Sequence, residues 1–472
     1  MNAAASTPWT IESAAAALRD GSTTSEDLVR SMFAAADRLD GELGVYLARF
    51  DETALAAARQ ADAELATGTD RGPLHGIPVG VKDILSTDEG PTTCQSLVLP
   101  ASWGDQGDGP VLSRLRDAGA VVMGKLTTME FAVGRPDRSK PFPLPRNPWN
   151  TERWTGGSSS GSGNGVAAGL MLGALGTDTG GSIRVPSAYC GITGLKATHG
   201  LVPKSGCFPL GYTYDHLGPM CRSAWDCAAM LTVMAGHDPS DRTSVPSAPI
   251  DYVAAIGANG GSLAGMRVGV LVNDSIRNHS APWTWQALQD AIAVLRDAGA
   301  EPVEVVAPLY DELHVATFLG LQAEAYAYHR NWLAERWDDY GRPTRLTLAL
   351  GALISGGDLA QVERVRQAGR ERIAAMMDAE GLAVLVSPTM GYGATHYSGA
   401  PRETISARAM HCPVWNGTGF PALALPMGLD PDGLPLSLQV IARPFEDATA
   451  LTVGHAYQQR TDWHLRRAPL HA

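Results

Sequence analysis

The sequence predicts an α/β protein, in which buried strands alternate with amphipathic helices. The clearest observation is the strand–helix–strand order at residues 266–271, 285–298 and 302–306, where a helical pattern separates two short apolar runs. A second observation is that no repeat of fixed period and no low-complexity linker interrupts the chain. We therefore expect a single domain that spans residues 1–472.

The N-terminal part, residues 10–66, is predicted to consist of helices. Apolar residues recur at helical spacing in 11–19, 26–39 and 52–65. Ser25 is expected to cap the second helix, because a hydroxyl at this position accepts a hydrogen bond from the first turn.

An apolar run at residues 73–85 predicts the first buried strand, and it contains a lysine, Lys82. Residues 111–118 favour a helix and 120–123 a second short strand. The segment 135–155 is rich in Pro, Arg and Trp and is expected to be a long loop.

The last third continues the same organisation. Residues 311–378 are mostly helical in pattern, and 382–386 form a short apolar run closed by Ser-Pro. Residues 434–441 predict another strand and 447–461 the final helix.

Composition excludes several classes of function. The net charge is −12 with no basic cluster, so we expect no nucleic-acid partner. The six cysteines show no C-x-x-C and no metal spacing with histidine, so we expect no metal site, no cofactor and no disulfide framework. The N-terminus does not read as a signal peptide and no apolar stretch is long enough to span a membrane. These features predict a soluble, cytoplasmic protein.

Two Gly/Ser loops, residues 154–163 and 176–184, are the most informative part of the chain. Glycine lets a backbone approach a ligand closely, and consecutive N–H groups can converge on one anion. A serine hydroxyl becomes a nucleophile when a nearby group accepts its proton. A flexible linker is the simpler interpretation, but a linker would not enclose the apolar segment 166–175.

Two segments match the residue pattern of a known motif, but the sequence around each of them does not support it. Residues 157–161 read G-x-S-x-G, but the preceding residues 148–154 do not predict the buried strand that a nucleophile elbow requires. Residues 119–125 have Walker A spacing, but Leu126 stands where Ser or Thr would bind magnesium. We therefore expect neither an α/β-hydrolase nor a nucleotide-binding protein.

Lys82 is unusual because it lies inside an apolar run. Burying an ammonium group is costly unless the group is paired or loses its proton. One interpretation is a snorkelling lysine with its amine in water, and the other is a desolvated, neutral lysine that acts as a general base toward a serine.

Together these residues resemble the amidase signature hydrolases. Gly-Val-Lys-Asp at 80–83, Gly-Gly-Ser-Ser at 156–159 and Gly-Thr-Asp-Thr-Gly-Gly-Ser-Ile-Arg at 176–184 match that family's motifs. The resemblance covers about 10–65, a signature core at 70–240, and 385–465. One departure is Ser160, where many members have glycine.

The resemblance implies a fold and a set of roles. The fold would be a large mixed β-sheet covered on both faces by helices. Ser182 would be the nucleophile, Ser158 a bridging serine after a cis peptide bond, and Lys82 the base. The remaining assignments are an oxyanion hole from the backbone N–H groups of Thr179, Gly180, Gly181 and Ser182, a bracing pair of Asp178 and Arg184, and unassigned loop hydroxyls at Ser159 and Ser160.

The implied activity is hydrolysis of a C–N acyl bond through an acyl-enzyme. Amides, aryl amides and carbamates (urethanes) are the expected small-molecule substrates, with esterase activity on the side. The alternative is the glutaminase (A) subunit of a tRNA-dependent amidotransferase, which works in a complex. Allophanate hydrolysis is disfavoured, because the sequence ends soon after Trp463. The sequence leaves homo-oligomer formation open.

The family builds its substrate pocket from variable segments, which here would be 135–155, 200–215 and 310–400. The last of these carries Tyr328, Trp332 and Trp337 at helical spacing. Such a stripe fits core packing, or else it lines the pocket entrance and favours hydrophobic, aryl substrates.

Overall fold

A mixed β-sheet of eleven strands runs through the computed structural model, which describes residues 8–397 and 407–471. In spatial order the strands are β1 (Tyr46–Arg49), β3 (Val121–Leu126), β2 (Pro78–Lys82), β6 (Gly173–Asp178), β8 (His216–Cys221), β7 (Thr193–Lys196), β12 (Ala422–Leu429), β13 (Pro435–Ile441), β11 (Leu382–Pro388), β9 (Arg267–Leu271) and β10 (Glu301–Val305). The predicted α/β class and the large mixed sheet are confirmed.

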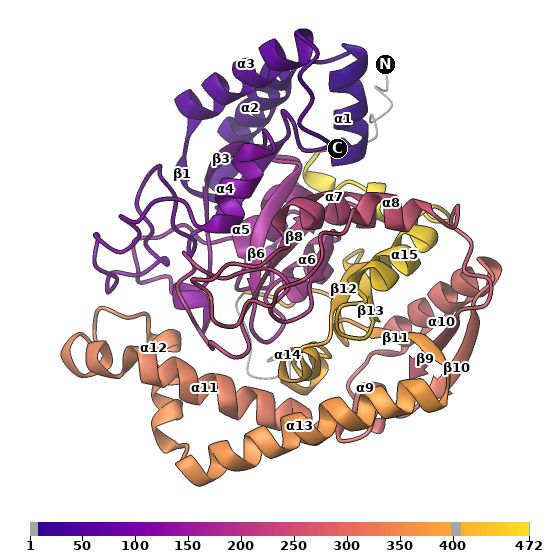
Figure 1. Ribbon diagram of the computed structural model, residues 1–472. Helices are drawn as coiled ribbons and strands as arrows, with labels where there is room; N and C mark the ends of the chain where they lie inside the picture. Colours follow the sequence, from indigo (N-terminus) through magenta and orange to yellow (C-terminus); the bar gives the residue numbers. More distant parts are fainter. Residues whose placement is uncertain (1–7, 398–406, 472) are drawn as a thin grey trace.

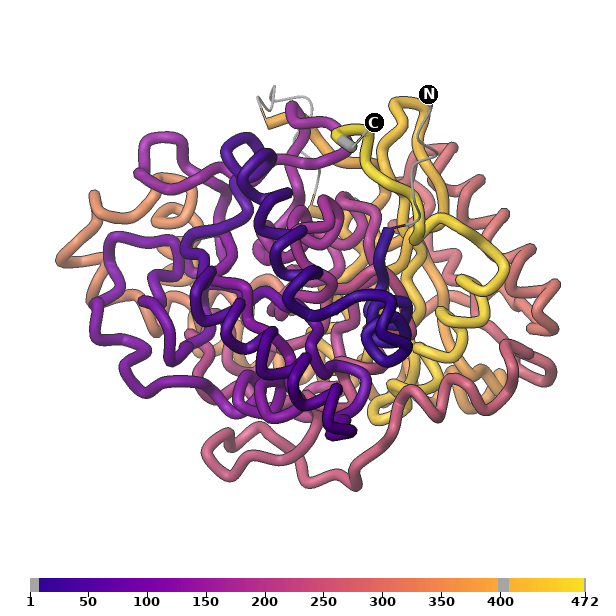
Figure 2. The backbone as a smooth tube through the Cα atoms, turned by 90° about the horizontal axis from the view of Figure 1, so that it is seen from above, coloured from indigo at the N-terminus to yellow at the C-terminus, as the bar shows by residue number. Residues whose placement is uncertain are grey.

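The sheet brings distant parts of the sequence together. The N-terminal third supplies one edge and β9 and β10 the other. In Figure 2 violet segments of the first third lie to the left and rose segments to the right. Near the first edge, β2 pairs in parallel with β3 and with β6. Because β2 and β6 run in parallel, their C-terminal ends lie at the same edge of the sheet, and β8 pairs antiparallel with the other side of β6.

Helices cover both faces of this sheet (Figure 1). One face carries α1 (Ile11–Asp20), α2 (Ser25–Leu43), α3 (Asp51–Ala66), α4 (Pro110–Asp117), α7 (Ala224–Met234), α8 (Tyr252–Gly257), α10 (Pro282–Asp297) and α15 (Asp447–Gln458). The other carries α9 (Asp274–Asn278), α11 (Tyr310–Glu335), α13 (Gly356–Ala379) and α14 (Pro413–Thr418). Long helices α11 and α13 lie side by side, with α12 (Arg342–Leu350) at their end.

The two apolar cores follow from the two-residue period of the strands. In β11, Val384 and Val386 pack into the first core, whereas Leu385 between them packs into the second. A strand buried on both faces reads as a continuous apolar run, which is the pattern that predicted it.

Most predicted elements are present, with two corrections. The cap of α2 is Thr24, whose hydroxyl accepts from Asp27 N, and the Ser25 prediction is wrong because Ser25 Oγ donates to the Gly76 carbonyl instead. The loop 135–155 contains a small hairpin of β4 (Arg146–Asn147) and β5 (Asn150–Trp154). Because β5 is outside the main sheet, it does not form the buried strand of a nucleophile elbow.

Two short buried helices begin in the Gly/Ser loops. α5 (Ser160–Ala167) begins within the first loop segment, and α6 (Arg184–Cys190) begins at the last residue of the second. Each segment therefore joins a strand, β5 or β6, to a buried helix N-terminus. In the described part of the chain, no helix combines the length and apolar character of a membrane span.

Candidate active site

Lys82 is the last residue of β2 and is fully buried. Its Nζ lies 2.7 Å from Ser158 Oγ and 2.6 Å from Thr177 Oγ1. The structure thus excludes the snorkelling interpretation. Thr177 belongs to the second loop motif, but no sequence pattern singles it out, since its contact with Lys82 depends on the parallel pairing of β2 and β6.

Burial lowers the pKa of Lys82 to about 7, although the nearby Asp178 and Asp215 carboxylates act in the opposite direction. A lysine with this pKa is largely neutral slightly above pH 7. Its lone pair is then able to accept a proton from the Ser158 hydroxyl that it contacts.

Ser158 is buried and follows a cis peptide bond from Gly157. Its carbonyl accepts hydrogen bonds from the backbone N–H of Met129 at 3.1 Å and from Thr128 Oγ1 at 2.9 Å. The neighbouring segment after β3 therefore fixes the serine backbone, and the hydroxyl faces Lys82.

The next two serines hold the loops in place. Ser159 Oγ donates to the Thr177 carbonyl and accepts from the Thr177 N–H, both at 3.1 Å, and Ser159 N donates to the carbonyl of Ser182. Ser160 Oγ donates to the Gly156 carbonyl at 2.9 Å and so closes its own loop. Ser159 thus joins the first Gly/Ser loop to the second.

The second loop is organised around a fully buried ion pair. Arg184 donates to both carboxylate oxygens of Asp178, each at 2.9 Å, and neither side chain is exposed. Burial alone would raise the pKa of Asp178, but the charge and hydrogen bonds of Arg184 hold it well below its usual range. The same carboxylate accepts from the backbone N–H groups of Gly181 and Ile183, on either side of Ser182.

Ser182 itself is partly exposed and lines a cavity of about 300 Å³. Gly157, Thr179 and Gly180 line the same cavity. The structure therefore places the predicted loop residues beside one cavity, with Lys82 and Ser158 buried behind them. No sequence-predicted site residue lies elsewhere in the fold.

The cavity walls are mostly apolar, and all three variable segments contribute to them. Residues 135–155 supply Arg135 and Trp154, and residues 200–215 supply Leu210. From the segment 310–400, α11 supplies Phe318. The remaining side chains of the wall are Met129, Ala132, Val133, Val185, Tyr189, Leu321, Gln322, Thr347, Met390, Ala407 and Met410. Such a site buries an apolar group of a ligand.

The expected aromatic stripe does not line this cavity. Trp332 stacks on Phe131 and Phe208 in a buried cluster, and Trp337 lies at the surface under the guanidinium of Arg345. For Trp332 and Trp337 the entrance interpretation is wrong, and the first of them is in the core. The aromatic residue of α11 that reaches the cavity is Phe318, about three helical turns before the stripe begins.

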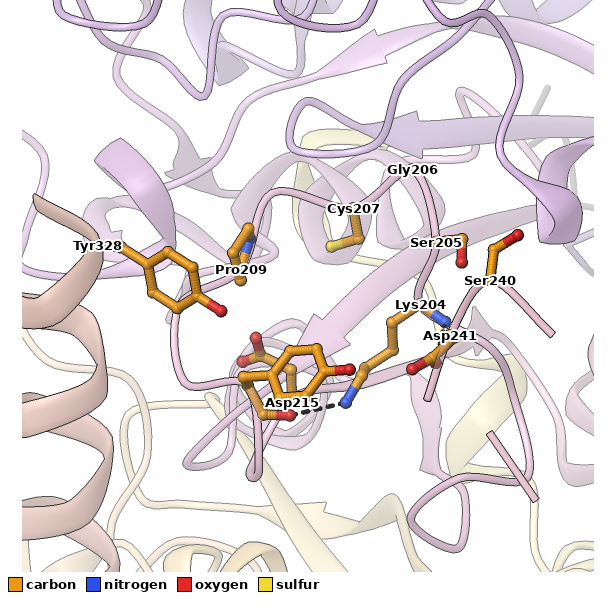
Figure 3. Close-up of a pocket in the computed structure, with 10 residues that line it drawn as sticks. Lys204, Ser205, Gly206, Cys207, Pro209, Asp215, Ser240, Asp241 and Tyr328 are labelled. Atoms are coloured by element: carbon orange, nitrogen blue, oxygen red, sulfur yellow. Dashed lines mark hydrogen bonds between the residues drawn. The ribbon is translucent and has the colours of Figure 1, made fainter. Parts of the chain in front are cut away.

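A second, smaller cavity of about 200 Å³ is lined by residues of the segment 204–215, by Ser240 and Asp241, and by Tyr328 (Figure 3). Tyr328 of α11 lies beside Pro209 at one side of it, and Lys204 Nζ donates to the carbonyl of Tyr212 at 2.7 Å. Asp215 in its wall accepts a 2.5 Å hydrogen bond from Thr179 Oγ1. This carboxylate therefore connects the second cavity with the loop that carries Ser182.

Comparison with known proteins agrees with this geometry. The family model described as Amidase matches residues 27–451. The A subunit of the glutamyl-tRNA(Gln) amidotransferase from Chloroflexus aggregans is 37% identical, with 98% of each chain covered. Among solved structures, the native peptide amidase of Stenotrophomonas maltophilia superposes with a TM-score of 0.84 at 29% identity, covering 99% of each chain.

A second solved structure is more similar in shape. It comes from a vestigial protein complex that reveals the evolutionary origins of an s-triazine catabolic enzyme. Its TM-score is 0.88 at 28% identity, with 98% of this chain and 100% of that chain covered. The family model matches most of the chain, and the solved structures share its fold over nearly the whole length. The chain belongs to the amidase family, whose members are the amidase signature hydrolases.

Proposed function

We propose that the protein hydrolyses the C–N bond of small-molecule amides with Ser182 as nucleophile, Ser158 as bridging residue and Lys82 as base. The observation that carries this proposal is the 2.7 Å contact between Lys82 Nζ and Ser158 Oγ, directly behind the cavity that Ser182 lines. A neutral lysine in this position is a base for a serine hydroxyl.

In the first step, Ser182 Oγ attacks the carbonyl carbon of the amide. Its proton passes to Ser158 Oγ as the Ser158 proton passes to Lys82 Nζ. The protonated relay then returns a proton to the amide nitrogen, the C–N bond breaks, and the amine leaves with the acyl group on Ser182. A water molecule then attacks the acyl carbon and gives a proton to the same relay. The bond between the acyl carbon and Ser182 Oγ breaks, the relay returns the proton to Ser182 Oγ, and the acid leaves.

The negative charge that forms on the carbonyl oxygen needs donors that are already in place. Of the four N–H groups that the resemblance implies, that of Gly181 already donates to Asp178 Oδ1 at 2.7 Å. We assign the oxyanion hole to the other three, of Thr179, Gly180 and Ser182. In this assignment the Asp178–Arg184 pair serves to hold the loop in the shape that presents them.

The apolar cavity favours amides with a hydrophobic or aryl group over small aliphatic amides. Burying a phenyl-sized group is worth about 1.5–3 kcal/mol, which corresponds to roughly 10- to 150-fold in kcat/KM. The same acyl-enzyme chemistry extends to carbamates and esters, since each presents an acyl carbon to Ser182.

A glutaminase component of an amidotransferase is the second candidate, because a relative at 37% identity is named as part of such an enzyme. Glutamine is a zwitterion and needs an anion for its ammonium group as well as a cation for its carboxylate. Arg135 supplies a cation, but no Asp or Glu is among the described residues that line the cavity. The cavity therefore fits an apolar amide better than it fits glutamine.

Turnover by the purified chain separates the two candidates. We expect acetanilide to exceed both acetamide and glutamine in kcat/KM by roughly 10-fold or more, without any added protein. The measurement is amine or ammonia release over a concentration series of each substrate. Ammonia release from glutamine that requires partner subunits and charged tRNA would establish the amidotransferase function instead.

The pH dependence tests the assignment of the base. A protonated Lys82 has no lone pair, so kcat/KM should fall as the pH drops below about 7 and reach a plateau above it. Lys196 is also buried and also has a pKa lowered to about 7, so it needs a control. The acid limb should persist in Lys196→Met, and its persistence in Lys82→Ala would show that another group is the base.

A further inference from the structure

Arg135 is the only charged side chain among the described residues that line the cavity beside Ser182. The protein as a whole carries a net charge of −12, so a cavity with one cation and no described anion is locally opposite in sign to the molecule. A charge in this wall acts on whatever the cavity binds, because a bound ligand packs against it.

Among the described residues, the guanidinium of Arg135 has no polar partner. It is exposed, and within the described residues it has neither an ion pair nor a hydrogen bond. Its contact is with the ring of Trp154, whose centroid lies 5.8 Å from the guanidinium carbon. By contrast, Arg153 in the same segment is paired with Asp432, and Arg146 donates to the Thr151 carbonyl.

Two further donors next to Arg135 also lack a partner. Tyr189 Oη and Trp154 Nε1 are buried, and neither has a hydrogen bond in the described structure. Both residues line the cavity, and their rings pack edge to face with centroids 6.4 Å apart. Buried polar groups are normally satisfied, so these two unpartnered donors, in the same wall as the Arg135 guanidinium, indicate a place for an acceptor that is brought from outside.

We propose that Arg135, Trp154 and Tyr189 form a subsite for a carboxylate, and that the preferred substrates are apolar amides that carry an acidic group away from the scissile bond. Arginine suits this role because its planar guanidinium donates two parallel hydrogen bonds to a carboxylate. The inference rests on the proposed function, since it assigns the acidic group to the substrate of Ser182. The apolar walls hold the remainder of that substrate.

Two matched pairs of substrates test the subsite. In the first pair, 4-acetamidobenzoate differs from acetanilide by a carboxylate on the amine side. In the second, N-phenylsuccinamate differs from butyranilide by a carboxylate on the acyl side. For at least one pair we expect the anionic member to have a KM about 10- to 100-fold lower at similar kcat, and the preference should weaken at high salt.

Substitution of Arg135 then distinguishes recognition of the substrate's carboxylate from a purely structural role in holding the Trp154 ring. In Arg135→Leu the KM of the anionic member should rise until the preference for it disappears, and Arg135→Lys should keep part of the preference. Arg138→Leu is the matched control, because Arg138 is exposed in the same segment and lies 6.0 Å from the ring of Tyr397, outside the cavity. An equal loss for both members of a pair in Arg135→Leu would overturn the proposal.

Binding without turnover makes the test independent of catalysis. Titration calorimetry with Ser182→Ala should show that the favoured anionic amide binds at least 10-fold more tightly than its neutral partner, and that Arg135→Leu abolishes the difference. Equal affinities in both pairs would refute the subsite, even in an active enzyme. Anionic preference without hydrolysis of any amide by the wild-type protein would support the subsite and refute the proposed function.

Discussion

Replacing Ser182, Ser158 or Lys82 with alanine should each lower kcat by roughly 10⁴-fold or more, with the protein still folded. Ser182→Ala removes the attacking oxygen. Ser158→Ala leaves Lys82 Nζ without the hydroxyl that it contacts at 2.7 Å, and Lys82→Ala removes the final acceptor of the proton. The measurement is single-turnover hydrolysis of an anilide, with circular dichroism to verify the fold.

The three losses should not add, because the residues act as a unit. A triple alanine variant should be about as inactive as the worst single variant. Ser160→Ala is the matched control, since it deletes a buried hydroxyl in the same loop whose hydrogen bond goes only to the Gly156 carbonyl. Near wild-type turnover by Ser158→Ala would refute the three-residue relay.

Replacing Arg184 with leucine should lower the free energy of unfolding by about 3–5 kcal/mol. The substitution leaves Asp178 as an unpaired charge in a site with no exposure, and removes hydrogen bonds to the Cys412 carbonyl and to Asn416 as well. Urea denaturation followed by tryptophan fluorescence measures the change. Activity should fall in parallel, because the Asp178 carboxylate also holds the backbone on either side of Ser182.

An exposed ion pair provides the comparison. Arg30 contacts Glu26 on the surface of α2, where its side chain is 58% exposed, and Arg30→Leu should cost no more than about 1 kcal/mol. If Arg184→Leu were no more destabilising than Arg30→Leu, the buried pair would not be what holds the Ser182 loop.

The outer elements of the fold could be predicted from the sequence, because their patterns are local. Apolar residues at helical spacing place α1, α3 and α10 within a few residues of their observed ends. Buried parallel strands such as β9 and β11 read as short apolar runs. The predicted and observed elements agree because each of them buries a face that its own sequence defines.

The centre of the sheet is harder to predict. β6 consists of Gly173–Asp178, which holds two glycines and two polar residues and has no alternation, so its sequence predicts only an apolar segment between loops. It is a strand because β2 and β8 pair with its two sides. β7, β8 and β12 are absent from the sequence prediction for the same reason, since their pairing depends on contacts between residues far apart in the chain.

The candidate site shows a similar division. The positions of Lys82, Ser158 and Ser182 come from the resemblance, and their proximity follows from the order of the strands, which no local pattern encodes. Thr177 and Arg135 could not be assigned from the sequence. Thr177 acts through a contact across two strands, and Arg135 belongs to a loop whose path brings it beside Trp154.

The most direct test of the account is to locate the acyl group on the enzyme. Rapid mixing with p-nitrophenyl benzoate, acid quenching within the first turnover and peptide mapping by mass spectrometry would identify the acylated residue. We predict a benzoyl group on Ser182, absent from Ser182→Ala and strongly reduced in Lys82→Ala. A benzoyl group on any other residue, or turnover by Ser182→Ala at the wild-type rate, would contradict the assignment of Ser182 as the nucleophile.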